Sequence, residues 1–139
     1  MTQADLLNFI RQHRWAVQAS VSAGGAPQAA LVGFAVTDAF ELIFDTLDTT
    51  RKALNLGGNG RIAFVIGGWV DNDERTVQYE GIADIPAGDD LQRLKDIYFS
   101  VFPDGRERQK WPGLVYFRTK PLWVRYSDFN RTPLRIASR

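Results

Sequence analysis

Runs of apolar and β-branched or aromatic residues, separated by short polar segments, recur along this chain, as is typical of strands. Seven such stretches are bounded by glycine, proline or short polar residues, and they cover residues 15–22, 27–37, 40–45, 61–67, 75–85, 114–119 and 122–127. Residues 23–26 predict a hairpin turn between the first two strands, and Lys120-Pro121 predicts a hinge between the last two.

Three segments have the pattern of helices instead. Residues 2–11 place Leu6, Leu7 and Ile10 on one face, and residues 89–102 repeat apolar residues at helical spacing after two acidic cap candidates, Asp89 and Asp90. A short helix is predicted from Thr49 or Thr50 to residues 57–58, whose glycines are typical of a helix end. Many short strands without regular strand–helix alternation favour a mainly β fold, a closed antiparallel barrel with short flanking helices.

Composition narrows the class of protein further. The 139 residues predict one domain, residues 1–139, and a formal net charge of +1 gives no reason to expect nucleic acid or a membrane surface as partner. The absence of cysteine excludes disulfides and thiolate chemistry. The polar start, with Thr2, Gln3 and Asp5, is unlike a signal peptide, so we expect a cytoplasmic protein.

The most informative stretch leads from a predicted strand, residues 41–44, into the short helix. Asp45 to Thr50 are small and polar, Thr46, Thr49 and Thr50 add hydroxyl groups, and Arg51 and Lys52 add two positive charges at the helix start. A helix N-terminus also carries unpaired N–H groups and partial positive charge, so this arrangement predicts an anion site, most simply for a phosphate. On these residues alone, a capped surface helix with solvated Arg51 and Lys52 is an equally good interpretation.

Other candidate chemistry is sparse. His13 is the single histidine, and no nucleophile motif is present, so we expect neither a metal site nor acyl transfer. Trp15, Phe64, Tyr116 and Trp123 lie in predicted strands and are expected in the core. Trp69 and Trp111 lie in predicted loops, where each would either cover a planar ring or anchor its loop or a subunit interface.

In order along the chain, Phe44, Thr46, Thr50, Arg51 and Lys52 resemble the flavin-phosphate motif of the pyridoxamine 5'-phosphate oxidase-like family. In that motif, a strand ending in an aromatic residue and Thr is followed by Ser/Thr-Arg-Lys at a helix start. The flanking segments, residues 26–34, 59–65 and 75–83, resemble the family's neighbouring strands, so the resemblance covers nearly the whole chain.

The resemblance implies an FMN-binding split barrel, an antiparallel Greek-key-type barrel of six to seven strands, that forms a homodimer with FMN at the interface. The phosphate would be held by Thr46, Thr50, Arg51 and Lys52. The ring would lie along the strand matched by Leu31, Val32, Gly33 and Phe34. Asp45, Thr76 and Trp111 complete the expected cofactor site, with Thr76 standing where vitamin-oxidising members have Gln.

The chain departs from the vitamin-oxidising enzymes where they grip the substrate phosphate. Ala35 stands at their Lys and Phe102 at their Arg, while Tyr98 keeps their Tyr; Arg106 or Arg108 is the alternative source of positive charge. We therefore expect an FMN-dependent oxidoreductase that acts on another small molecule, with no protein acid or base assigned. The alternatives are a non-catalytic flavin- or haem-binding protein for storage or sensing, a related deazaflavin as cofactor, and a barrel that has lost its cofactor.

Overall fold

The structure, a computed structural model, describes residues 1–131 and 135–138. Residues 132–134 and the last residue of the expected domain, 139, lie outside the described part. The helices are α1 (Gln3–Arg11), α2 (Arg51–Gly58), α3 (Gly88–Val101) and α4 (Gly105–Arg108). The strands are β1 (Trp15–Val21), β2 (Pro27–Gly33), β3 (Ala35–Val36), β4 (Leu42–Leu47), β5 (Arg61–Gly67), β6 (Arg75–Asp84), β7 (Leu114–Asp128) and β8 (Arg135–Ser138).

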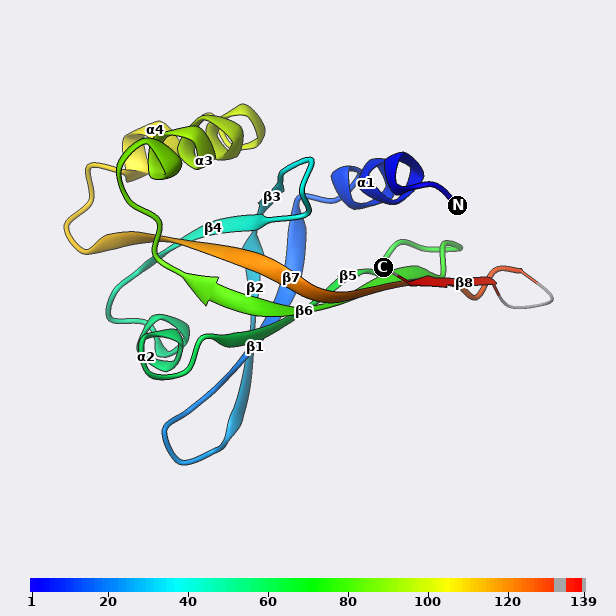
Figure 1. The fold of residues 1–139 in the computed structure, drawn as a ribbon, viewed down its shortest axis with the longest axis horizontal. Coiled ribbons are helices and arrows are strands. Elements are labelled where there is room, and N and C mark those ends of the chain that lie inside the picture. Colours follow the sequence, from blue (N-terminus) through cyan, green and yellow to red (C-terminus); the bar gives the residue numbers. More distant parts are fainter. Residues whose placement is uncertain (132–134, 139) are drawn as a thin grey trace.

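The strands form one antiparallel sheet in the order β2-β1-β5-β6-β7-β4-β3, with β8 added beside β7. The two ends of this order, β2 and β3, are consecutive in sequence, so the sheet curls back toward itself, as Figure 1 shows. The predicted mainly β, antiparallel barrel-type fold with short helices is therefore confirmed.

The predicted strand over residues 27–37 is interrupted at Phe34. Its first part, β2, pairs with β1, whereas β3 pairs with β4. The N–H of Phe34 donates instead to the carbonyl of Arg14, and the ring of Phe34 is buried in the core. The unbroken apolar run conceals this change of partner, because both parts are rich in strand-forming residues.

The predicted hinge at Lys120-Pro121 is wrong, because β7 continues through it as one strand. The irregularity is a bulge: Glu80 of β6 lies opposite Trp123, while the next residue, Gly81, lies opposite Pro121. A bulge tolerates a proline, which has no N–H to donate to the ladder. A Cβ on Gly81 would collide with the carbonyl of Lys120, so this crossing requires glycine.

The helix starts follow the predictions with one exception. Thr2 caps α1 in a reciprocal hydrogen-bond pair with Asp5, and Thr50 caps α2. The N-cap of α3 is Ala87, so Asp89 and Asp90 are not caps as expected but lie in the first turn, where they favour the helix dipole. The glycines at 57–58 end α2, as predicted.

Two clusters of buried side chains make up the core. The larger fills the curled sheet beneath α1 and α2 and includes Phe64, and the smaller lies between α3 and β3–β4 and includes Tyr116, so these two aromatic residues are buried as expected. Trp123 is only half-buried, and the expectation is wrong for Trp15, whose side chain is 52% exposed. Among the described helices, none combines the length and apolar character needed to cross a membrane.

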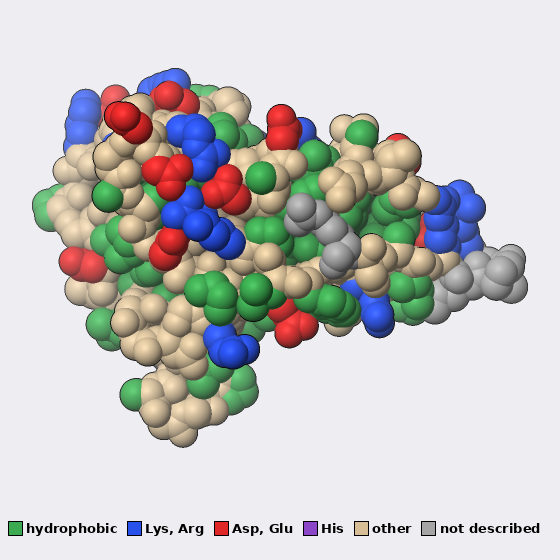
Figure 2. Space-filling view, viewed as in Figure 1, with side chains coloured by type: hydrophobic (Ala, Val, Ile, Leu, Met, Phe, Trp, Pro, Cys, Tyr) green, Lys and Arg blue, Asp and Glu red, His purple; other side chains and the backbone are tan. Residues whose placement is uncertain are grey.

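A charged network ties α3 to β7. The buried guanidinium of Arg118 on β7 binds Asp84 at 2.7 and 2.8 Å, Asp90 at 2.7 Å and Glu41 at 3.1 Å. Figure 2 shows side chains of both signs gathered over this part of the molecule, with hydrophobic side chains along the strands beside them. The network therefore links β7 to β6, to α3 and to Glu41 before β4.

Candidate functional site

The start of α2 is built around the hydroxyl of Thr50. This oxygen accepts from the N–H of Ala53 at 3.3 Å, donates to the carbonyl of Leu47 at 2.9 Å, and lies 2.9 Å from the hydroxyl of Thr46. Because Thr50 has already used its hydrogen, Thr46 donates to it. Both hydroxyls therefore take part in the helix cap. The phosphate-binding role expected for these two side chains remains a prediction.

The remaining donors belong to Arg51 and Lys52. The first bond from the helix interior joins the N–H of Leu54 to the carbonyl of Thr50, and Ala53 is already capped, so the N–H groups of Arg51 and Lys52 stay open. Within the described part of the chain, neither side chain has a carboxylate partner. Partial burial lowers the pKa of Lys52, because it removes water from the ammonium group. A half-buried cation without a counter-ion is suited to an anionic ligand.

A cavity of about 430 Å³ lies between this helix start and the β1–β2 hairpin. Its lining residues come from the hairpin (Gln18, Ser20, Gln28, Ala29, Ala30) and from the helix start (Thr49, Thr50, Arg51, Lys52). The amide of Asn55 donates to Ser20 at 3.1 Å and to Gln28 at 2.8 Å, which fixes the floor of the cavity to α2. The positively charged helix start thus lies across the cavity from polar side chains of the hairpin.

The expected ring-binding residues lie on the same hairpin. Among the described strands only β1 pairs with β2, so backbone groups on the other edge of β2 are open to a ligand. Val32 and Phe34 are buried, whereas Leu31 is 61% exposed and Gly33 is half-buried. Contacts to a ring along this edge would come mainly from the backbone and from Leu31.

Asp45 lies apart from the cavity in a compact polar cluster. It accepts from the hydroxyl of Tyr98 and from the guanidinium of Arg108, both at 3.1 Å. Burial, together with the charge of Asp45, raises the pKa of Tyr98. Arg108 also pairs with Asp104, so its charge is already balanced. Arg108 therefore does not supply a free cation in place of the missing Lys and Arg.

Within one chain Thr76 lies far along the sheet from Asp45, whereas Trp111 is two residues from Gly113, whose carbonyl accepts from the N–H of Asp48 at 2.8 Å just before α2. Thr76 lies opposite Ser127 on β7, and Asp45 lies opposite Tyr116, so the two positions are separated along β7 by about 35 Å. Trp111 stands 54% exposed between α4 and β7. The roles expected for Thr76 and Trp111 remain predictions.

The positions that would carry cations in the vitamin-oxidising enzymes are apolar and closed. Ala35 and Phe102 are both buried in the second core cluster, under α3. The ring of Phe102 lies against Gly33, close enough that a Cβ there would be 2.8 Å from the ring. Neither side chain offers a positive charge to a phosphate. Two arginines lie close by: the guanidinium of Arg14 is 4.7 Å from the centroid of the Phe102 ring, and Arg11 lines a cavity of about 340 Å³ together with Ala35.

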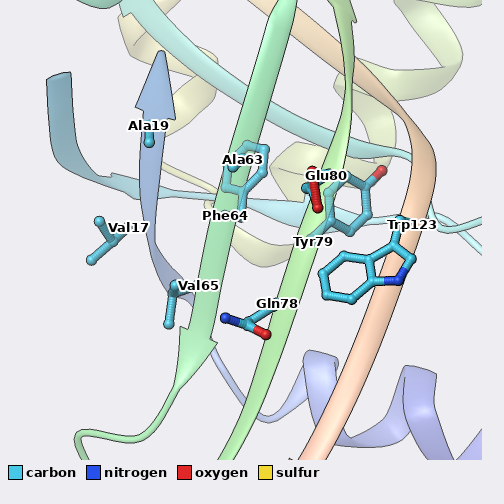
Figure 3. Close-up of a pocket in the computed structure, with 9 residues that line it drawn as sticks. All are labelled: Val17, Ala19, Ala63, Phe64, Val65, Gln78, Tyr79, Glu80 and Trp123. Atoms are coloured by element: carbon cyan, nitrogen blue, oxygen red, sulfur yellow. The ribbon is translucent and has the colours of Figure 1, made fainter. Parts of the chain in front are cut away.

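The outward face of the sheet carries a second feature, which the sequence reasoning missed. Two shallow hollows of about 250 and 260 Å³ adjoin each other on β1, β5, β6 and β7, and they share Ala19, Ala63, Glu80 and Trp123. Figure 3 shows the indole of Trp123 extending from β7 toward β6, with Val17 and Val65 on the neighbouring strands. A signal was present: residues 61–67 are apolar at nearly every position, as in strands covered on both faces.

The comparisons with known proteins concern the family and the fold. The family model described as Pyridoxamine 5'-phosphate oxidase matches residues 2–128. No curated protein has a significant sequence match to the chain.

Several solved structures have the same fold at low sequence identity. A haem-binding protein from Mycobacterium smegmatis is 16% identical with a TM-score of 0.85, over 100% of this chain and 58% of that one. The haem storage protein HutZ from Vibrio cholerae is 15% identical with a TM-score of 0.73, over 85% and 88% of the two chains. A pyridoxamine 5'-phosphate oxidase-related, FMN-binding protein from Nostoc punctiforme is 16% identical with a TM-score of 0.69, over 98% and 92%. The chain thus spans less than two thirds of the M. smegmatis protein.

Proposed function

The chain belongs to the pyridoxamine 5'-phosphate oxidase family, and from this premise we propose that it is a homodimeric FMN-binding oxidoreductase acting on a small molecule. The observation that carries the proposal is the unpaired, half-buried Lys52 beside Arg51, at the roof of a cavity next to the open edge of β2. A phosphate would satisfy the cations, and the strand edge would satisfy a ring with hydrogen-bonding edges.

The phosphate end of FMN fits the helix start. A phosphate carries about two negative charges at neutral pH and has several acceptor oxygens. The N–H groups of Arg51 and Lys52, their side chains and the hydroxyl of Thr49 supply donors and positive charge around one end of the cavity.

The ring end fits the edge of β2. When bound, FMN would supply the transfer of hydride or electrons, which is chemistry that no side chain of this protein offers. The protein's own contribution is orientation: backbone groups along Leu31 to Phe34 would contact the ring edges, and the buried side chains of Val32 and Phe34 hold that strand in place.

A second subunit is expected on the apolar outward face. Leu31, Val65 and Leu122 are 61%, 41% and 65% exposed, and Trp123 lines both hollows there. Exposed apolar side chains on one sheet face favour association, and the commonest solution is a two-fold dimer. A partner seated beside β2 would also cover the ring, which a single small barrel leaves open.

The substrate differs from that of the vitamin-oxidising enzymes in this proposal. Ala35 and Phe102 are buried and uncharged, so a substrate phosphate would lose the two cations that the vitamin-oxidising enzymes present at these positions. A small molecule without a phosphate, or a nicotinamide electron donor, fits the protein better.

Haem is the second candidate ligand, because the M. smegmatis and V. cholerae proteins of the same fold bind or store it. Histidine is the commonest haem ligand, and His13 is the single one in this chain. Its Nε2 atom is buried, and its ring packs against Phe9 and Trp69 at centroid distances of 5.0 and 6.0 Å. His13 lines a cavity of about 340 Å³ with Arg11 and Ala35 and is the residue that would ligate haem. FMN remains the first candidate because of the unpaired cations at the start of α2.

The test is the binding of flavins to the purified protein. FMN should bind tighter than riboflavin, which lacks the phosphate, and Lys52→Met should weaken FMN by about tenfold or more while leaving riboflavin unchanged. Lys120→Met, at an exposed lysine of β7, is the matched control. Equal affinity for the two flavins, or saturable haem binding without flavin binding, would overturn the proposal.

A further inference from the structure

Gln18 is a buried amide without a hydrogen-bond partner. It lies in the middle of β1, between Ala30 of β2 and Phe64 of β5, and its side chain is 1% exposed. Its Oε1 atom is buried and accepts no hydrogen bond from any described residue, and its Nε2 atom donates none. Most buried polar side chains are satisfied, so this exception needs an explanation.

The neighbouring polar side chains, unlike Gln18, do have hydrogen-bond partners. Ser20 and Gln28 line the same cavity, and both accept from Asn55. Helix α2 thus satisfies Ser20 and Gln28 on the hairpin side of the cavity. The amide of Gln18, the third polar side chain on that side, is left to bind a ligand that enters the cavity.

The hydrogen-bonding groups of the amide restrict which ligand can satisfy it. A glutamine offers an acceptor and a donor, whereas the oxygens of a phosphate dianion only accept. The phosphate expected at Lys52 leaves Oε1 of Gln18 unsatisfied. A hydroxyl group donates and accepts, so it satisfies either end of the amide.

We infer that Gln18 binds a hydroxyl of the sugar-alcohol chain that joins the phosphate of FMN to its ring, and so selects a hydroxylated phosphate ester over a bare anion. This inference rests on the proposed function, because it places the chain next to the phosphate at Lys52. Gln18 and Lys52 line one cavity of about 430 Å³, which exceeds the needs of a phosphate alone and lies in the range of small-molecule sites.

The test compares three flavins on the Gln18→Met variant: FMN, riboflavin and lumiflavin, in which a methyl group replaces the whole hydroxylated chain. Affinity for FMN and for riboflavin should each fall roughly five- to tenfold, the scale of one neutral hydrogen bond, and lumiflavin should bind as before. Gln12→Met, at an exposed glutamine outside the cavity, is the matched control and should change none of the three.

Thermal unfolding without ligand separates this role from a purely structural one. Methionine has a similar shape and no polar atoms to satisfy, so the ligand-free variant should be as stable as the unmodified protein or melt a few degrees higher, on the order of 3 °C. A binding role thus predicts weaker flavin binding in a protein that is no less stable.

The outcomes separate the inference from the proposed function. If the unmodified protein fails to bind FMN, the proposed function falls and the inference falls with it. If FMN binds and Gln18→Met leaves its affinity unchanged, only the inference is overturned. An equal loss for lumiflavin would assign Gln18 to the ring and also overturn it.

Discussion

Phe102 lies with its ring against the backbone of Gly33, so that the end of α3 packs directly on the last residue of β2. The guanidinium of Arg14 lies over the same ring, 4.7 Å from its centroid, and donates to the carbonyl of Val101 at 2.9 Å. This contact connects the second core cluster to the strand along which the ring is expected.

Gly33→Ala should destabilise the protein by about 1–3 kcal/mol, because a Cβ at this position would lie 2.8 Å from the ring and force Phe102 aside. Gly24→Ala is the matched control, since a Cβ there has no neighbour within 4 Å. Chemical denaturation of both variants measures the difference. Equal stability of the two would show that the contact with Phe102 is loose.

FMN binding should depend on pH through Lys52. Burial lowers the pKa of this lysine, so its charge is lost at a lower pH than that of an exposed lysine, and affinity should fall as pH rises toward that pKa. At the acid side, affinity should fall as the phosphate takes up its second proton near pH 6. Flavin fluorescence titrations across this range measure both limbs. In Lys52→Met the fall in FMN affinity at alkaline pH should disappear, while the fall at acid pH should remain. If the alkaline fall persists in this variant, another group is responsible for it.

Pyridoxine phosphate and pyridoxamine phosphate should not be oxidised at a useful rate. The two missing charge-assisted contacts at Ala35 and Phe102, worth roughly 1.5–3 kcal/mol each, would lower the rate by about two to four orders of magnitude if they add. Oxygen consumption by FMN-loaded protein tests this, with reduction of the flavin by dithionite and reoxidation in air as the control. Robust turnover of either vitamer would show that another group holds the phosphate.

Val65→Lys should convert the expected dimer to a monomer and reduce FMN retention, because it places a charge beside the apolar hollows of the outward sheet face. Val70→Lys is the control: Val70 is 49% exposed in the loop between β5 and β6. Sedimentation velocity measures the assembly state. A dimer that persists in Val65→Lys, or a monomer that binds FMN fully, would place the interface elsewhere or make it irrelevant to the cofactor.

Asp73 should stabilise the fold at neutral pH and lose this effect in acid. Hydrogen bonds from Arg75, at 2.7 and 2.6 Å, lower the pKa of Asp73 to about 2. A carboxyl with a lowered pKa stabilises the folded state above its ordinary pKa and loses that contribution as pH falls through the lowered value. Asp73→Asn should therefore reduce stability by about 1 kcal/mol at neutral pH, and the difference should vanish near pH 2. Thermal melts at several pH values measure it, and the same profile for Asp71→Asn, an exposed carboxylate of the same loop, would contradict the assignment.

The helix start at Thr50 was predictable from the sequence because its determinants are local. A cap residue, a polar run and two cations follow one another within eight residues, and the physics of capping acts over that distance. The hydrogen bonds of the hydroxyls were not predictable, because the bond between Thr46 and Thr50 depends on the path of the chain between β4 and α2.

The errors concern partners that are distant in sequence. The strand pairing changes at Phe34, whose N–H donates to the carbonyl of Arg14, and β7 is continuous through Pro121 because β6 provides a bulge. The amide of Gln18 occupies a position in β1 that alternation marks as inward, and a glutamine at an inward position was the available signal of a polar cavity. The partners of Asp45 come from two helices, α3 and α4, more than fifty residues away.

The fifteen-residue strand β7 also determines in what order the molecule can fold. The β1–β2 hairpin and α2, which surround the cavity, lie within residues 15–58 and are joined by contacts that are short in sequence. The sheet is complete only when β7 pairs with β4, which places Thr46 opposite Val115. These two residues are nearly seventy positions apart in sequence, and contacts of such separation are slow to form. The walls of the cavity can therefore assemble early, while the rigid framework behind them is completed last, and refolding should show a slow phase that reports on the β4–β7 junction.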